Sequence, residues 1–95
     1  MGLSKQELTE LRVLVDEVIY SRSKAEAKGP VRRLESRAAQ LSSQLDSYLY
    51  GKLGEIIAYA KDASGQPRNK EHWIVCVEQC WYVFRTRSAD DREVV

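Results

Sequence analysis

Three residues near the end of the chain, His72, Cys76 and Cys80, are of the types that bind zinc. They follow one another at steps of four residues, so a helix would place all three on one side. Three ligands spread along about 12 Å of one helix cannot converge on an ion whose bonds are about 2.0 to 2.3 Å long. Only a neighbouring pair could bind a metal, with the other ligands supplied by another chain. We therefore expect no metal, and Cys76 and Cys80 as small core side chains.

The sequence contains few residues or motifs that could support other catalytic or cofactor chemistry. There is one histidine, and we find no nucleophile elbow, no phosphate loop and no carboxylate pair at a fixed spacing. The sequence thus predicts a protein that is not an enzyme and binds no cofactor. A metal or redox sensor at His72, Cys76 and Cys80 is kept as a second alternative.

Basic residues are concentrated in one segment. Residues 22–37 contain six Lys and Arg against two Glu, whereas residues 1–21 are mainly acidic, although the net charge of the whole chain is only +1. Arg32, Arg33 and Arg37 could contact the phosphates of a nucleic acid. No helix-turn-helix, zinc-finger or RNA-binding signature accompanies them. We favour pairing of these charges with acidic residues of the first helix or of a second subunit, and keep nucleic-acid binding as the first alternative.

Two tyrosines, Tyr48 and Tyr50, lie beside Gly51 and Gly54. Tyrosine brings a large contact area to an interface at little entropic cost, and glycine lets a partner approach closely. We predict a partner-binding surface that contains Tyr48, Tyr50, Arg32, Arg33 and Arg37. Equally, the rings could cap the core next to the tryptophans.

Three helices are predicted to carry these residues. A Ser4-x-x-Glu7 capping box begins a helix over residues 5–26, and Gly29-Pro30 ends it and begins a second one over residues 30–62. For residues 73–84 propensity favours a strand, but no other segment offers a strand to pair with. Their apolar stripe therefore favours a third helix over residues 70–86, with residues 87–95 as a frayed tail.

The length of the second predicted helix determines the shape that we expect for the molecule. A helix over residues 30–62 would be about 50 Å long, whereas a compact domain of this length has a radius of gyration near 12 Å. Unless its glycines break it, this helix would extend beyond the rest of its domain. Another chain would then have to cover the apolar side chains of this overhang. We expect an all-α fold, a three-helix bundle built on a long antiparallel helical hairpin, as a single domain over residues 1–95, elongated and dimeric.

Composition limits the class of protein. The 95 residues are 43% hydrophobic and 31% charged, as in ordinary globular domains. We find no apolar run of membrane-spanning length and no hydrophobic secretory signal, and two cysteines agree with a reducing compartment, so we predict a cytoplasmic protein that does not associate with a membrane. The function predicted is that of a small protein–protein interaction module, an adaptor, regulator or inhibitor, whose partners are another protein and a second copy of itself.

Overall fold

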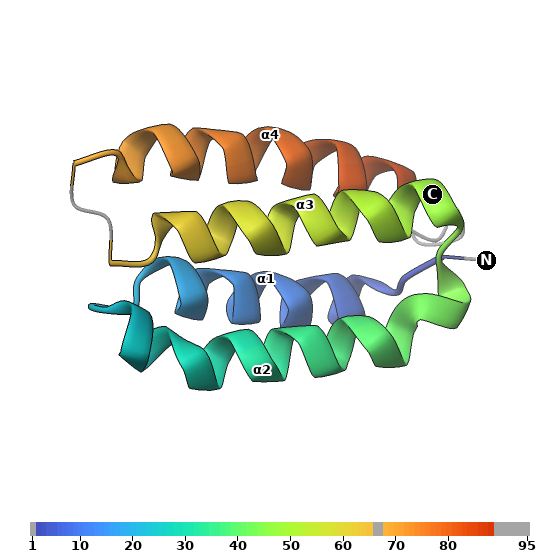
Figure 1. Cartoon of the computed structure of the whole chain (residues 1–95). Helices are drawn as coiled ribbons and strands as arrows, with labels where there is room; N and C mark the ends of the chain where they lie inside the picture. Colours follow the sequence, from blue (N-terminus) through green and yellow to red (C-terminus); the bar gives the residue numbers. More distant parts are fainter. Residues whose placement is uncertain (1, 66–67, 89–95) are drawn as a thin grey trace.

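The computed structural model is all-helical and describes residues 2–65 and 68–88. Four α-helices follow one another, with one short 3₁₀ turn between the second and the third: α1 (Lys5–Ile19), α2 (Lys24–Leu41), η1 (Ser42–Gln44), α3 (Ser47–Ala63) and α4 (Lys70–Ser88). The chain reverses direction at each connection, so the four helices lie side by side (Figure 1). The predicted all-helical class is confirmed, but the described residues form four α-helices, not three. None of these helices is long and apolar enough to cross a membrane.

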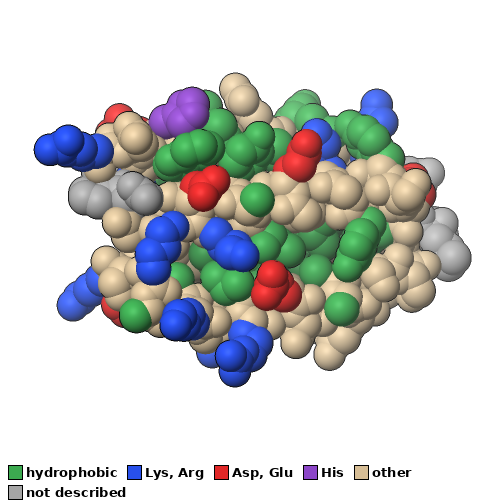
Figure 2. Space-filling model, viewed as in Figure 1, with side chains coloured by type: hydrophobic (Ala, Val, Ile, Leu, Met, Phe, Trp, Pro, Cys, Tyr) green, Lys and Arg blue, Asp and Glu red, His purple; other side chains and the backbone are tan. Residues whose placement is uncertain are grey.

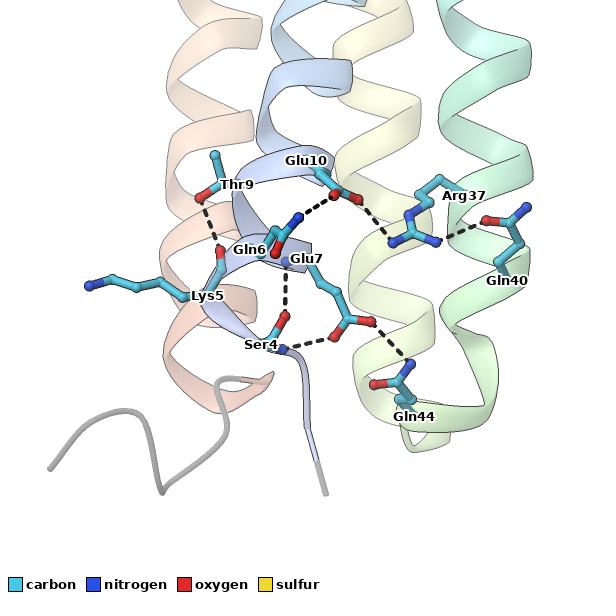
Figure 3. Close-up of polar contacts among 9 residues, drawn as sticks. All are labelled: Ser4, Lys5, Gln6, Glu7, Thr9, Glu10, Arg37, Gln40 and Gln44. Carbon is cyan, nitrogen blue, oxygen red and sulfur yellow. Dashed lines mark hydrogen bonds and ion pairs between the residues drawn. The ribbon is translucent and has the colours of Figure 1, made fainter.

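The start of α1 is the predicted capping box. The Glu7 backbone N–H donates to Ser4 Oγ at 3.1 Å, and the Ser4 backbone N–H donates to Glu7 Oε1 at 2.9 Å (Figure 3). The second carboxylate oxygen of Glu7 accepts from Gln44 Nε2 at 3.4 Å, which joins α1 to η1. The Ser4 N–H stabilises the charged carboxylate and thereby lowers the pKa of Glu7 below its ordinary value.

The first helix ends earlier than predicted, at Ile19 instead of residue 26. Ser23 has an extended backbone, and its side chain accepts from the Glu26 N–H at 3.1 Å, so it caps the next helix. Ser23-x-x-Glu26 is a second copy of the Ser-x-x-Glu spacing that begins α1. The first connection is therefore made by residues 20–23, not by Gly29-Pro30.

Gly29 and Pro30 lie inside α2, where the sequence predicts a break. A proline in a helix interior removes one hydrogen bond and costs about 3 kcal/mol. The buried face of α2 nevertheless stays in phase on both sides of the proline, with Ala27 before it and Leu34 after it. Burial of this face against the other helices outweighs the local preference.

The long helix predicted over residues 30–62 is wrong, because the chain breaks at residues 42–46. Leu45 is extended, and Asp46 caps α3 by accepting the Leu49 N–H at 2.8 Å. Gly51 and Gly54 lie within α3 and do not interrupt it. The described chain has a radius of gyration of 13.0 Å and extents of 40 × 23 × 21 Å, close to a compact domain of this length. The overhang on which the predicted dimer rested is absent.

One hydrophobic core joins all four helices. Leu11 and Val15 of α1, Leu34 of α2, Ile56 of α3 and Phe84 of α4 are fully buried within it. The helix predicted for residues 70–86 is confirmed and extends two residues further, to Ser88, whose carbonyl accepts the Leu3 N–H at 2.6 Å. The rest of the predicted tail, residues 89–95, lies outside the described residues.

Candidate functional site

The five predicted partner-binding residues do not form one surface. Tyr50 and Arg32 both border the space between α2 and α3, and Arg32 also lines, together with Arg33 and Arg37, a hollow on the α1 side of α2. Tyr48 lies elsewhere: its ring is half exposed and lies below the Arg87 guanidinium, 5.1 Å from the ring centre, and near the Lys52 ammonium at 5.7 Å. Tyr48 therefore belongs to the end of the molecule where α3 begins and α4 ends.

Arg33 and Arg37 are engaged within the chain. Arg33 Nη2 lies 3.2 Å from Glu17 Oε2, and Arg37 Nη2 lies 2.9 Å from Glu10 Oε2. Arg37 also donates to Gln40 Oε1 at 2.9 Å, and Figure 3 shows its guanidinium between the two acceptors. The basic side of α2 that faces α1 is thus held by the acidic side of α1, which is the pairing favoured from the sequence.

A groove lies between α2 and α3, and we call it the α2–α3 groove. It consists of two hollows of about 320 and 410 Å³ that share Glu35 and Lys61 as lining residues and so adjoin each other. The residues that line it are Lys24, Ala27, Lys28, Val31, Arg32, Glu35 and Ala38 of α2, then Tyr50, Leu53, Gly54, Ile57, Ala58, Lys61 and Asp62 of α3, and Ser64 after it. Of the predicted partner-binding residues, Tyr50 and Arg32 line this groove.

Small residues keep the groove open. Gly54 and Ala58 are one helical turn apart on the α3 side, both exposed, and a Cβ added at Gly54 would meet nothing within 4 Å. A glycine inside a helix costs about 1 kcal/mol relative to alanine, and the internal packing does not require one here. The floor beneath is apolar, formed by Leu53, Ile57 and Val31.

Positive charge is concentrated at one end of the groove. Its lining contains four cationic side chains, Lys24, Lys28, Arg32 and Lys61, and two anionic ones, Glu35 and Asp62. Within the described residues no ion pair joins any of these six to another residue. Figure 2 shows hydrophobic side chains in the hollow between α3 and α2, and Lys and Arg side chains gathered over its left end. The groove therefore offers an apolar floor and a basic end.

The predicted zinc residues do not converge. His72 Nε2 lies 3.9 Å from Cys76 Sγ, and the His72 ring packs edge-on against Trp73 at 4.8 Å. Cys80 lies one turn further along, partly buried against the core, and this burial raises the pKa of its thiol. Both cysteines are free thiols, and no three His, Cys, Asp or Glu side chains gather as a metal site in the part of the chain that the structure describes.

No protein-family model matches the chain, and no match was found among curated proteins or among solved structures.

Sequence reasoning missed most of the groove. Val31 and Ile57 belong to the apolar stripes of the sequence, yet both are only partly buried and line the groove. The missed signal is the spacing of Tyr50, Gly54 and Ala58, which places one ring and two small residues on one face of a helix. The other side of the groove could not be predicted, because α2 lies beside α3 only when the helix over residues 30–62 is divided in two.

Proposed function

We propose that this protein is a non-enzymatic protein–protein interaction module whose α2–α3 groove receives a helix of another protein. The observation that carries the proposal is the open groove between two helices, with partly buried Val31 and Ile57 in its apolar floor and the small residues Gly54 and Ala58 on its α3 side. An amphipathic helix binds such a groove by laying its apolar face on the floor. Bound in this way, the module would act as an adaptor, regulator or inhibitor.

Dimensions and composition favour a helix over a small ligand. The α3 side of the groove extends from Tyr50 to Lys61, about 16 Å at 1.5 Å per residue, and it is open along one side. A pocket for a small molecule encloses most of its ligand, which an open groove does not. Tyr50, half exposed at the rim, is of the residue type that most often contributes strongly to binding energy.

Nucleic-acid binding is the weaker alternative for the same basic residues. Arg33 and Arg37 are engaged by carboxylates of α1, so only part of the predicted basic cluster remains for phosphates. The cations that remain border an apolar floor, which suits a protein helix better than a phosphate backbone. A strong decrease in affinity for duplex DNA or RNA with rising salt would favour this alternative.

A metal or redox sensor at His72, Cys76 and Cys80 stays a prediction with a separate test. It requires zinc in the purified protein and an effect of Cys76→Ala on binding or assembly. The free thiols and the single close pair of His72 and Cys76 give it little support.

Two glycines of α3 provide a matched pair of variants that tests the groove. Gly54 lines it, whereas Gly51 is an exposed residue of the same helix that does not, and a Cβ at either would meet nothing within 4 Å. Leucine at either position favours the helix by close to 1 kcal/mol, so neither variant should unfold the protein. We expect the tagged wild type and Gly51→Leu to capture the same protein from cells of the source, and Gly54→Leu to lose it.

The result that would contradict the proposal is equal capture by both variants while both retain the helical circular dichroism of the wild type. Loss of capture with Gly51→Leu alone would also place the binding surface outside the groove.

A further inference from the structure

Two large apolar side chains are exposed on the outward side of α4. Val75 and Tyr82 are 52% and 63% exposed, although the other side of α4 already carries the fully buried Val77 and Phe84. Seven residues, or two helical turns, separate Val75 from Tyr82, so both lie on one outward face with Gln79 between them. A helix that has apolar residues on both sides has more apolar surface than its own domain covers.

This face is complementary to itself when two copies of α4 run in opposite directions. A two-fold axis near the middle of the helix, between Glu78 and Gln79, brings Val75 of one copy opposite Tyr82 of the second copy, and the reverse pair follows by symmetry. Val75 and Tyr82 are seven residues apart, which is the repeat of a helix seam.

The charges beside the seam fit the same arrangement. Glu71, Glu78 and Arg85 lie at steps of seven residues along one flank of the exposed face. Antiparallel pairing around a two-fold axis places this flank against the same flank of the second copy. Glu71 then lies close to Arg85 of the second copy, once at each end of the helix pair.

The central carboxylates would approach each other, but each has its own counter-ion. Glu78 is paired with the Arg12 guanidinium of α1, and that guanidinium also lies over the Trp81 ring, 5.6 Å from its centre. Each copy therefore brings a cation next to its own Glu78. The antiparallel arrangement of the two helices therefore leaves neither Glu78 carboxylate without a counter-ion near the two-fold axis.

We propose that two copies of this chain associate through the outward face of α4, antiparallel, with Val75 against Tyr82 and Glu71 against Arg85. This proposal does not rest on the α2–α3 groove, which contains no residue of α4. A single helix pair buries less than the roughly 800 Å² per partner of a standard interface. The dimer is accordingly weak, with a dissociation constant on the order of micromolar or above.

Sedimentation equilibrium of the full chain tests the proposal over a range of concentrations. The wild-type mass rises from 10.9 kDa toward twice that value as the concentration rises. Tyr82→Glu is expected to remain at the monomer mass, because it buries charge in the seam. Val13→Glu is the control, since Val13 is an apolar residue on α1 that is 51% exposed, against 63% for Tyr82, and it should leave the association unchanged.

A charge exchange identifies the antiparallel arrangement. Glu71→Arg and Arg85→Glu each place two like-charge contacts in the dimer and should raise its dissociation constant by about tenfold, whereas the double variant restores both pairs and the wild-type constant. The proposal is overturned if the wild type stays at 10.9 kDa up to millimolar concentration, if Tyr82→Glu still dimerises, or if the double variant is no better than the singles. Loss of the dimer with Gly54→Leu instead would assign self-association to the α2–α3 groove and likewise overturn it.

Discussion

The two edges of α2 carry similar basic side chains in different surroundings. On the edge that faces α1, Arg33 and Arg37 form ion pairs with Glu17 and Glu10. On the edge that faces α3, Lys24, Lys28 and Arg32 border an apolar groove and form no ion pair with the described residues, although Arg32 also lines a hollow with Arg33 and Arg37. The difference shows that a basic cluster in a sequence is not one functional unit. The helix that packs against each edge decides whether its charges stabilise the fold or remain open to a partner.

The largest expected effect on the free energy of unfolding distinguishes the core side of α2 from its groove side. Leu34→Ala removes a fully buried side chain and should lower the free energy of unfolding by about 2 to 5 kcal/mol. Val31→Ala, on a partly buried groove residue, should lower it by about 1 kcal/mol or less. Urea unfolding of both variants measures the difference. Equal losses would mean that Val31 is a core residue and that the groove has no separate floor.

A smaller effect distinguishes the paired edge from the open one. A double-mutant cycle on Arg37 and Glu10 should give a coupling energy of about 0.2 to 1 kcal/mol that decreases with added salt, because both side chains are partly exposed. Arg32→Ala should leave the stability unchanged within about 0.5 kcal/mol. A coupling energy of zero together with a marked loss in Arg32→Ala would reverse the roles assigned to the two edges.

The smallest effect depends on pH and concerns the contact of α1 with η1 at the end of α2. The pKa of Glu7 is lower in the folded chain than in the unfolded one, so its stabilising contribution is present above the unfolded value near 4.5 and is lost as the pH falls through the lower folded value. Glu7→Gln should therefore be less stable than the wild type at pH 7, by at most about 1 kcal/mol for this partly exposed group, and the gap should close in acid. Unfolding curves at several pH values measure the gap. A gap that is independent of pH would attribute the effect to the shape of the side chain and not to its charge.

Local chemistry predicted the helical class and the start of α1 but not the helix boundaries. The Ser4 capping box and the apolar stripe of α4 are properties of neighbouring residues, and both are confirmed. The prediction of a break at Gly29-Pro30 is wrong, because burial of one continuous face of α2 outweighs the cost of the proline. The actual break before Asp46 contains no glycine or proline, and its local signals are the polar residues 42–44 and an aspartate that can cap the next helix.

The candidate site could be predicted only in part for the same reason. Tyr50 and Arg32 are residues of the right type, and the structure brings both into the groove. Arg33, Arg37 and Tyr48 share their chemistry but face other elements. Which of these side chains share a surface depends on the direction of the chain after residue 46. No single helix pattern contains that information.

Photo-crosslinking in cells of the source tests the central claim most directly, because it reports contact and not stability. A photoreactive phenylalanine derivative replaces Tyr50, a half-exposed aromatic residue that lines the α2–α3 groove, or Val13, an exposed residue on α1 that lies outside it. We predict that the Tyr50 position crosslinks to a partner protein, that the Val13 position does not, and that Gly54→Leu abolishes the crosslink. A crosslink from Val13 alone, or one from Tyr50 that persists in Gly54→Leu, would contradict the assignment of partner binding to the groove.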